Sequence, residues 1–382
     1  MYSINGYGDM IADDVRTDAY VQAIRQAIKP GSVVLDIGTG TGFFALLACR
    51  FGARRVYAVE PSDVIDVARE MAAVNLCAGS IEFIQAMSTE ITLPEPADVI
   101  VSDLRGVLPF FQKHVVAIAD ARRRFLTPGG VLIPRSDTLW LACVEAPDSH
   151  RSITTPWSDN KYGLDMRAAR ALQANRWRRV VVKPDQMMTQ PECCGSVDYA
   201  TIVNPNLDTS VTVSATRAGT AHGLCVWFDA TLAEGIHFSN SPEKPNLIYG
   251  NAFFPWPEPV GLDAGDTIAV NLRSNLIGDE YLWTWETRVH RKNKPGEAAI
   301  HFRQSDFFGE PMPLGKLRKQ SADHVPELND DGRIDCLILR LMDEEKALGE
   351  IAREVASQFP CRFARWRDAL TRVGAMSTRY SR

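Results

Sequence analysis

The feature that most constrains this chain is a glycine-rich loop between a buried strand and a helix. The run SVVLDIG (32–38) is continuously apolar and β-branched before its final residues, which is typical of a strand buried on both faces. TGFFALLACRFGA follows it with the apolar spacing of a helix. Between them Gly38, Gly40 and Gly42 alternate, so the backbone can approach a ligand closely. The loop predicts a ligand site at one edge of a parallel sheet.

A carboxylate at the end of the next strand narrows the ligand class. The second apolar run, RVYAVEP (55–61), reaches Glu60 about 20 residues after the loop, where an acid can accept both hydroxyls of a ribose. Nicotinamide dinucleotides and S-adenosylmethionine both place a ribose there, so the form of the loop has to separate them.

The loop favours S-adenosylmethionine over a dinucleotide. It reads D-x-G-x-G-x-G from Asp36, whereas a dinucleotide loop is G-x-G-x-x-G and presents a pyrophosphate to the helix N-terminus. S-adenosylmethionine carries an ammonium and a sulfonium, which suit a nearby acid, and the same acid would repel a pyrophosphate. We therefore expect S-adenosyl-L-methionine as the cofactor, and no metal.

The periodicity of the chain changes twice and predicts three segments. Strand and helix signals alternate first, which indicates a doubly wound, mostly parallel sheet. Period-two alternation with turn residues follows and indicates an antiparallel sandwich or barrel. The last stretch returns to helical spacing. The expected fold is α/β with a cofactor domain at 31–150, a β-barrel at 151–315 and a small helical region at 316–382.

Composition excludes several function classes. The 382 residues carry 42 Lys and Arg against 47 Asp and Glu, a net charge of −5, which does not favour a nucleic-acid partner. No apolar run approaches the ~20 residues of a membrane span, and the N-terminus does not resemble a signal peptide. The eight cysteines form no C-x-x-C pair and are expected to be free thiols. These features predict a cytoplasmic protein with no membrane partner.

With these motifs in place, the chain resembles the protein arginine methyltransferase family. The likeness covers about residues 5 to 290 and is carried, in the family's order, by MIADDVRTDAY, VLDIGTGTG, ARRVYAVEPS, VSDLRG, FLTPGGVLIPRSDTLWLACVE, KYGLDM and GIHFSNSPEKP. The resemblance implies a helical cap at 1–30, a class I methyltransferase domain with a Rossmann-like sheet, and a β-barrel with a dimerisation arm. YGLDMRAARALQANRWRR (162–179) falls where the arm would be, and a homodimer is expected.

The resemblance also implies a set of cofactor-binding residues. Arg16 is similar to the arginine that holds the cofactor's carboxylate, and Glu60 to the acid that holds its ribose. Ser88 and Thr89 stand where the family contacts the adenine; the family has a glutamate at the position of Thr89, and Glu90 is its neighbour. The complete expected set is Arg16, Asp36, Gly38, Gly40, Gly42, Glu60, Ser88 and Thr89.

The acceptor side departs from the family pattern. The resemblance implies two glutamates that orient a guanidinium, and their positions here are Asp103, the candidate base, and the neutral Gln112. The Thr-His-Trp triplet falls near Leu247-Ile248-Tyr249, and Arg105 adds a charge that disfavours an incoming guanidinium. His114, just inside a helix, is expected at the surface.

Three readings of the function remain open at this point. The leading one is methyl transfer to a nitrogen on a peptide, protein or small molecule. A second is O- or C-methylation of another acceptor, for example in peptide natural-product modification. The third is a cofactor-binding scaffold that has lost catalysis and pairs with an active partner.

The C-terminal region carries its own resemblance. PELNDDGRIDCLILRLMDEEKALGEIAREVASQFP (326–360) is similar to the small PqqD-type domains that present leader peptides to modifying enzymes. The resemblance rests on an L-N turn, a helix, an acidic turn and a second helix. It implies a peptide acceptor, and the alternative is a helical cap or dimer contact.

Overall fold

The chain forms two compact units, which are described separately. The computed structural model describes residues 3–158, 162–293 and 300–381. The first unit spans Met1–Pro311 and the second Met312–Arg382. No helix in the described ranges is both long enough and apolar enough to cross a membrane.

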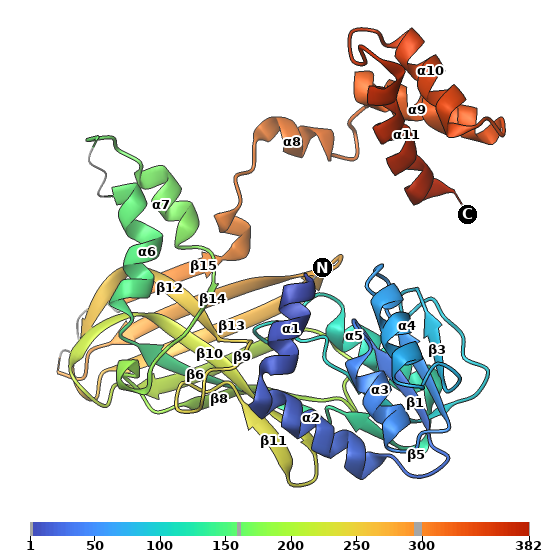
Figure 1. The fold of residues 1–382 in the computed structure, drawn as a ribbon. Coiled ribbons are helices and arrows are strands. Elements are labelled where there is room, and N and C mark those ends of the chain that lie inside the picture. Colours follow the sequence, from blue (N-terminus) through green and yellow to red (C-terminus); the bar gives the residue numbers. More distant parts are fainter. Residues whose placement is uncertain (1–2, 159–161, 294–299, 382) are drawn as a thin grey trace. The chain divides into compact units, whose positions relative to one another are not determined.

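A five-stranded parallel sheet forms the first layer of unit one (Figure 1). Its strands run in the order β3-β2-β1-β4-β5 and pair in parallel throughout. Three helices connect them: α3 (Phe43–Arg50), α4 (Ile65–Val74) and α5 (His114–Phe125). The expected α/β fold is therefore confirmed. The strands are β1 (Val33–Ile37), β2 (Arg55–Val59), β3 (Ile81–Ile84), β4 (Ala97–Ser102) and β5 (Leu126–Ile133).

Both faces of this sheet are covered, which explains the continuous apolar runs. All five residues of β1 are buried, and successive side chains point to opposite faces. Leu35 packs in one apolar cluster with Val115 and Ile118 of α5. Val34 packs in another with Ala45 of α3 and residues of the N-terminal helices.

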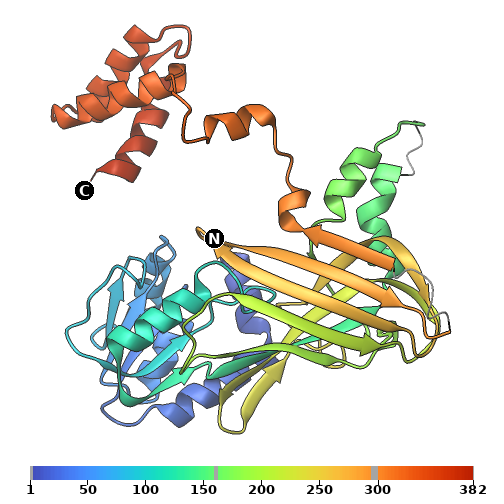
Figure 2. The same ribbon diagram turned by 180° about the vertical axis from the view of Figure 1, so that it is seen from behind.

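Two antiparallel sheets follow, as Figure 2 shows from the opposite side. One has the order β7-β12-β10-β6-β8, with β11 paired to β10, and the other has the order β15-β14-β13-β9. Trp256, Trp283 and Trp285 are fully buried in the cluster that these strands share. The strands are β6 (Ser136–Val144), β7 (Arg178–Val180), β8 (Glu192–Asp198), β9 (Leu207–Ser214), β10 (Gly219–Ala233), β11 (Ile236–Ser239), β12 (Asn251–Leu262), β13 (Thr267–Ile277), β14 (Glu280–His290) and β15 (Ile300–Ser305).

Strand β6 changes where the second sheet begins. It pairs antiparallel with β10 from Ser136 to Val144 and also with β8. The antiparallel part therefore starts at residue 136, directly after the last parallel strand, whereas the sequence places a boundary at 150. The connection consists of Pro134 and Arg135 alone, so the change of sheet leaves no loop that the sequence could show.

Helices surround the sheets of unit one. At the N-terminus, α1 (Ile4–Ala12) and α2 (Asp14–Ala27) precede β1. The pair α6 (Pro147–Ser158) and α7 (Arg167–Gln173) stands out from one end of the antiparallel sheets (Figure 1). The predicted arm thus falls on a projecting helical segment; Lys161 of its KYGLDM motif lies outside the described residues. Two short 3-10 helices complete the unit, η1 (Pro184–Gln186) and η2 (Asp306–Gly309).

The second unit is helical and has its own core. It contains α8 (Leu314–Lys319), α9 (Asp330–Asp343), α10 (Leu348–Gln358) and α11 (Trp366–Tyr380). Asn329 caps α9 by accepting a hydrogen bond from Gly332 N at 2.9 Å. The apolar face of α10 is buried at Ile351, Ala352 and Val355. These residues pack with apolar side chains of α9 and α11.

Candidate active site

A cavity of about 520 Å³ lies at the carboxyl ends of β1, β2 and β4. Gly38, Glu60 and Ser88 line one part of it, and Asp103 and Gln112 line another. Ligands of open α/β sheets bind at this edge. Five of the residues predicted for the cofactor and the acceptor therefore share one space.

Glu60 is held in a fixed orientation within this cavity. One carboxylate oxygen accepts hydrogen bonds from Ser62 N at 3.0 Å and from Ser62 Oγ at 2.6 Å. The other accepts one from Gly40 N at 3.2 Å. The oxygen that accepts from Gly40 keeps lone-pair capacity for a further donor. The side chain can thus receive ribose hydroxyls without first having to be ordered.

The glycines of the loop are required by its shape. Gly38 and Gly40 have φ angles of +72° and +54°, which L side chains adopt rarely. A Cβ on Gly38 would overlap Leu104, and one on Gly40 would overlap Tyr7. Gly42 also has positive φ and caps the start of α3. The loop therefore offers backbone rather than side chains to a ligand.

Asp36 is hydrogen-bonded to the loop residue Thr39 and does not line the cavity. Thr39 Oγ1 donates a 2.6 Å hydrogen bond to it, and its second oxygen has no hydrogen-bond partner among the described residues. Burial raises the pKa of Asp36 to about 7, against the opposing hydrogen bond from Thr39. At neutral pH this acid is thus only partly ionised, and it is less suited to attracting a cationic ligand than the sequence pattern indicates.

The residues expected near the adenine separate in the structure. Ser88 is buried and lines the cavity, and its carbonyl accepts a 2.7 Å hydrogen bond from Arg124. Thr89 and Glu90 are exposed and are not among the residues that line this space. The structure thus places Ser88, but not Thr89, in the wall of the cavity.

Asp103 is an acid of the site that forms ion pairs with two arginines. Its Oδ2 accepts hydrogen bonds from Arg16 Nε at 2.7 Å and from Tyr249 OH at 2.6 Å. Its Oδ1 accepts one from Arg105 Nε at 3.2 Å. Burial opposes ionisation, but the charges of Arg16 and Arg105 more than offset it and lower the pKa of Asp103 to about 2. The group is a carboxylate at any ordinary pH.

Arg16 lies between the cofactor loop and Asp103. It lines a small adjoining cavity together with Gly38 and Thr39, and its guanidinium pairs with Asp103. Asp13 fixes this position because it caps α2 through Arg16 N and also accepts a 2.7 Å hydrogen bond from Ile248 N. The side chain is thus placed to reach a cofactor carboxylate while it remains beside the acceptor region.

Arg105 turns into the protein instead of into the cavity. Its side chain is fully buried and pairs with Asp137 of β6 at 2.7 Å. It also donates to Tyr20 OH. No local motif predicts this ion pair, because Asp137 lies 32 residues after Arg105 in the chain. The like charge expected to repel a guanidinium is therefore compensated internally.

Two further residues of the acceptor region differ from the sequence expectation. Tyr249, in the segment where the family has a triplet with histidine, reaches Asp103 directly. His114 is 2% exposed instead of lying at the surface, and its Nε2 is 2.7 Å from Tyr199 OH. It also lines the cavity, beside Gln112, whose φ is +44°. Only the long-range fold brings these side chains to the site.

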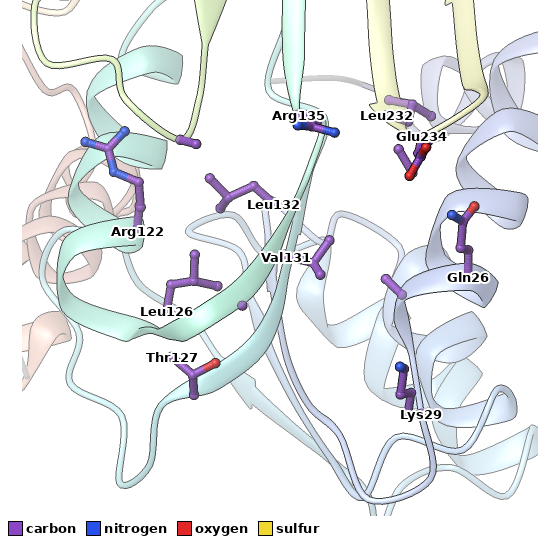
Figure 3. A pocket seen from close by; sticks show the side chains of 14 residues that line it. Gln26, Lys29, Arg122, Leu126, Thr127, Val131, Leu132, Arg135, Leu232 and Glu234 are labelled. Carbon is purple, nitrogen blue, oxygen red and sulfur yellow. The ribbon is translucent and has the colours of Figure 1, made fainter.

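A larger cavity of about 620 Å³ lies elsewhere in this unit (Figure 3). Apolar side chains such as Leu126, Leu132 and Leu232 line it, with Lys29 and Arg135 among its charged residues. None of the residues predicted for the cofactor or the acceptor borders it. The larger volume therefore does not mark the candidate site, because the predicted residues line the smaller cavity.

Family models match two consecutive parts of the chain. A model described as ribosomal protein L11 methyltransferase (PrmA) matches residues 15–135. A model described as the arginine methyltransferase oligomerization subdomain matches residues 135–277. The junction of the two matches coincides with the start of β6.

Curated relatives extend these matches. The chain is 31% identical over 271 residues to protein arginine N-methyltransferase 1 of Schizosaccharomyces pombe, covering 68% of this chain and 78% of that protein. It is 30% identical over 272 residues to protein arginine N-methyltransferase 1 of Chlamydomonas reinhardtii, covering 69% and 79%.

Solved structures share the fold. Arabidopsis thaliana protein arginine methyltransferase 10, described in a uniquely open conformation, superposes with a TM-score of 0.69 at 23% identity, covering 79% of this chain and 97% of that one. The Trypanosoma brucei PRMT1 enzyme–prozyme heterotetrameric complex with AdoHcy gives a TM-score of 0.71 at 22% identity, covering 78% and 97%.

Proposed function

Because the chain belongs to the protein arginine N-methyltransferase family, we propose that it transfers a methyl group to a nitrogen of an arginine-like side chain on a peptide or protein. It is an S-adenosylmethionine-dependent methyltransferase. The observation that carries the proposal is the single cavity that joins the ribose-type carboxylate Glu60 to Asp103 and Gln112.

The residues present fit the cofactor. Gly38 and Gly40 leave only backbone at the loop, and Glu60 is oriented to take ribose hydroxyls. Arg16 would hold the cofactor carboxylate, and Ser88 would lie beside the adenine. When bound, the cofactor supplies a methyl group on a sulfonium that is its own leaving group.

Asp103 and Gln112 would orient the nitrogen that accepts the methyl group. Asp103 contributes a permanent negative charge, and Gln112 contributes an amide oxygen that can accept from an N–H group. The rate of such a displacement comes mainly from alignment of the reacting atoms and exclusion of water. Asp103 and Gln112 would thus supply orientation in the same cavity that Glu60 lines.

A specific observation favours a second candidate, a non-guanidinium acceptor such as a hydroxyl, a carboxylate or a carbon. Asp103 is already paired with Arg16 and Arg105, and Gln112 is neutral. A guanidinium would therefore meet less uncompensated negative charge than two glutamates would provide. A scaffold without catalysis is disfavoured by the pre-oriented Glu60 and the intact loop.

The proposal extends to assembly and location. The projecting α6–α7 pair and the match to an oligomerization subdomain support a homodimer formed through this arm. The eight cysteines are free thiols, three of them exposed, which suits the reducing cytoplasm. The helical unit at Met312–Arg382 would bind a peptide acceptor or contribute to the dimer.

Labelled cofactor tests the function directly. We would incubate the purified chain and S-adenosylmethionine carrying an isotopically labelled methyl group with an arginine/glycine-rich peptide and, separately, with a cell extract, and locate the label by mass spectrometry. Label on arginine nitrogen supports the proposal, and label only on oxygen, carbon or other residues supports the second candidate. No binding of S-adenosylmethionine by calorimetry would contradict both.

Asp103→Asn separates the enzyme from a scaffold. The substitution keeps the shape but removes the charge, so we expect kcat to fall about 100-fold while the Kd for the cofactor changes little. Asp98→Asn, in the strand β4 that precedes Asp103 but outside the cavity, is the matched control. Normal turnover by Asp103→Asn would show that its charge is not used.

A further inference from the structure

A chain of buried hydrogen bonds connects two walls of the cavity. Arg105 Nε donates to Asp103 at 3.2 Å, and Arg105 Nη1 donates to Asp137 at 2.7 Å. Tyr199 OH donates to the other oxygen of Asp137 at 2.5 Å and lies 2.7 Å from His114 Nε2. Asp103 and His114, the two ends of this chain, both line the cavity, whereas the three residues between them do not.

The proton positions along this chain follow from its donors and acceptors. Asp137, paired with Arg105, accepts from Tyr199 as a carboxylate, although burial raises its pKa above the ordinary value. A tyrosine has one proton to donate, so the oxygen of Tyr199 must accept from His114. His114 therefore carries its proton on Nε2, and its Nδ1 holds a lone pair.

No donor among the described residues forms a hydrogen bond to the lone pair on Nδ1 of His114. Nδ1 of His114 is buried and lacks a hydrogen-bond partner among the described residues. Burial, and next the charge of Arg105, lower the pKa of His114 to about 3, so the ring is neutral at neutral pH. A buried polar atom without a partner requires an explanation, and because the residue His114 borders the cavity, a donor on a ligand held there is the candidate partner.

Resting on the proposed function, we infer that His114 Nδ1 accepts the hydrogen bond, and then the proton, of the methyl-accepting nitrogen. The nitrogen forms its bond to the methyl carbon while the sulfur–carbon bond breaks and sulfur keeps the electron pair. The proton that the nitrogen loses passes to Nδ1. The charge of Asp103 favours the resulting imidazolium, against burial and the charge of Arg105.

This assignment divides the work between two residues. The sequence predicts Asp103 as the general base, but in the structure three donors already bond to the oxygens of Asp103. Asp103 then orients by charge and His114 receives the proton. A base of low pKa is sufficient, because a nitrogen that has gained a methyl group before losing its proton is a strong acid.

The tautomer can be measured without any acceptor. We would label the histidines with ¹⁵N, record their ring resonances at neutral pH, and assign His114 from the signal lost in His114→Gln. A neutral ring protonated on Nε2 supports the inference. An imidazolium, or a ring protonated on Nδ1, would overturn it, whatever the chain methylates.

Kinetics with the arginine/glycine-rich peptide provide the second test. Gln at 114 can still reach Tyr199 but places no acceptor at Nδ1, so kcat should fall about 100-fold with the cofactor Kd unchanged. His114→Asn, which can place an amide oxygen near Nδ1, should retain more activity than His114→Gln. An unaltered kcat in His114→Gln would contradict the inference.

The control is His222→Gln in β10. His222 is also buried with an unpartnered Nδ1, but it does not line the cavity. Its kcat should match that of the unmodified protein. If the unmodified protein fails to methylate the peptide at all, the proposed acceptor class is contradicted, and the ¹⁵N spectrum still decides the role of His114.

Discussion

The cofactor half and the acceptor half of the cavity are built in different ways. In the cofactor half, Glu60 is held by Ser62, two residues away, and by Gly40, 20 residues away. In the acceptor half, Asp103 is held by Arg16 and Tyr249, at separations of 87 and 146 residues. The first half is thus specified by local sequence and the second by the packing of the whole unit.

The two halves also treat charge differently. Glu60 is surrounded by neutral donors, whereas Asp103 belongs to a buried set of two acids and two arginines. Removing one member of a buried ion pair leaves an uncompensated charge. Mutations in the acceptor half should therefore affect folding, and those in the cofactor half mainly binding.

The largest expected effect is on stability in Arg105→Met. This change leaves Asp137 buried without its cation, so the free energy of unfolding of unit one should fall by about 3–5 kcal/mol. Urea denaturation of the full chain, followed by tryptophan fluorescence, would measure it. Exposed Arg303→Met is the control, and equal stability of the two variants would refute the contrast between the halves.

Glu60→Gln should act on the cofactor with little effect on folding. Loss of a charged acceptor for the ribose hydroxyls is expected to weaken S-adenosylmethionine binding about 10- to 100-fold by calorimetry. The midpoint of thermal unfolding should move much less than in Arg105→Met. Glu90→Gln, which changes an exposed neighbour of Thr89, should bind normally. An unchanged Kd in Glu60→Gln would remove the ribose assignment.

The pH dependence of stability should have opposite signs in the two halves. The pKa of His114 is lowered to about 3, so its contribution is present above the unfolded pKa of about 6.5 and is lost as pH falls toward 3. The pKa of Asp36 is raised to about 7, so its contribution is present below about 3.9 and is lost as pH rises toward 7.

Two variants separate these contributions. Between pH 4 and 6.5 each group changes the free energy of unfolding by up to about 1.4 kcal/mol per pH unit, in opposite directions. His114→Gln should make stability fall more steeply with rising pH, and Asp36→Asn should make it rise. Denaturation series at several pH values would measure both slopes. Parallel profiles for the two variants would contradict the assigned shifts.

Thr89→Ala is expected to have the smallest effect. Thr89 is exposed beside the buried Ser88, so cofactor affinity should stay within about twofold, a change typical of surface positions. Ser88→Val, which alters the cavity wall, should weaken binding measurably in the same titration. A large loss in Thr89→Ala would return this residue to the cofactor site.

The contrast also explains what the sequence could predict. The loop, its flanking strand and helix, and Glu60 follow from period and spacing, because their contacts are local. The pairing of Arg105 with Asp137 and the burial of His114 depend on β6 and on Tyr199 after β8, and no motif marks either contact. Asp36 lies within β1, just before the loop, and its raised pKa follows from a burial that the loop motif does not predict.

The ion pair between Arg105 and Asp137 has a consequence for how such a chain can be recombined. Arg105 follows a strand of the parallel sheet, and Asp137 belongs to the first strand of the antiparallel part. A chimera that joins this cofactor domain to another second domain therefore needs an acid at the position of Asp137, since Arg105 would otherwise be buried without this partner.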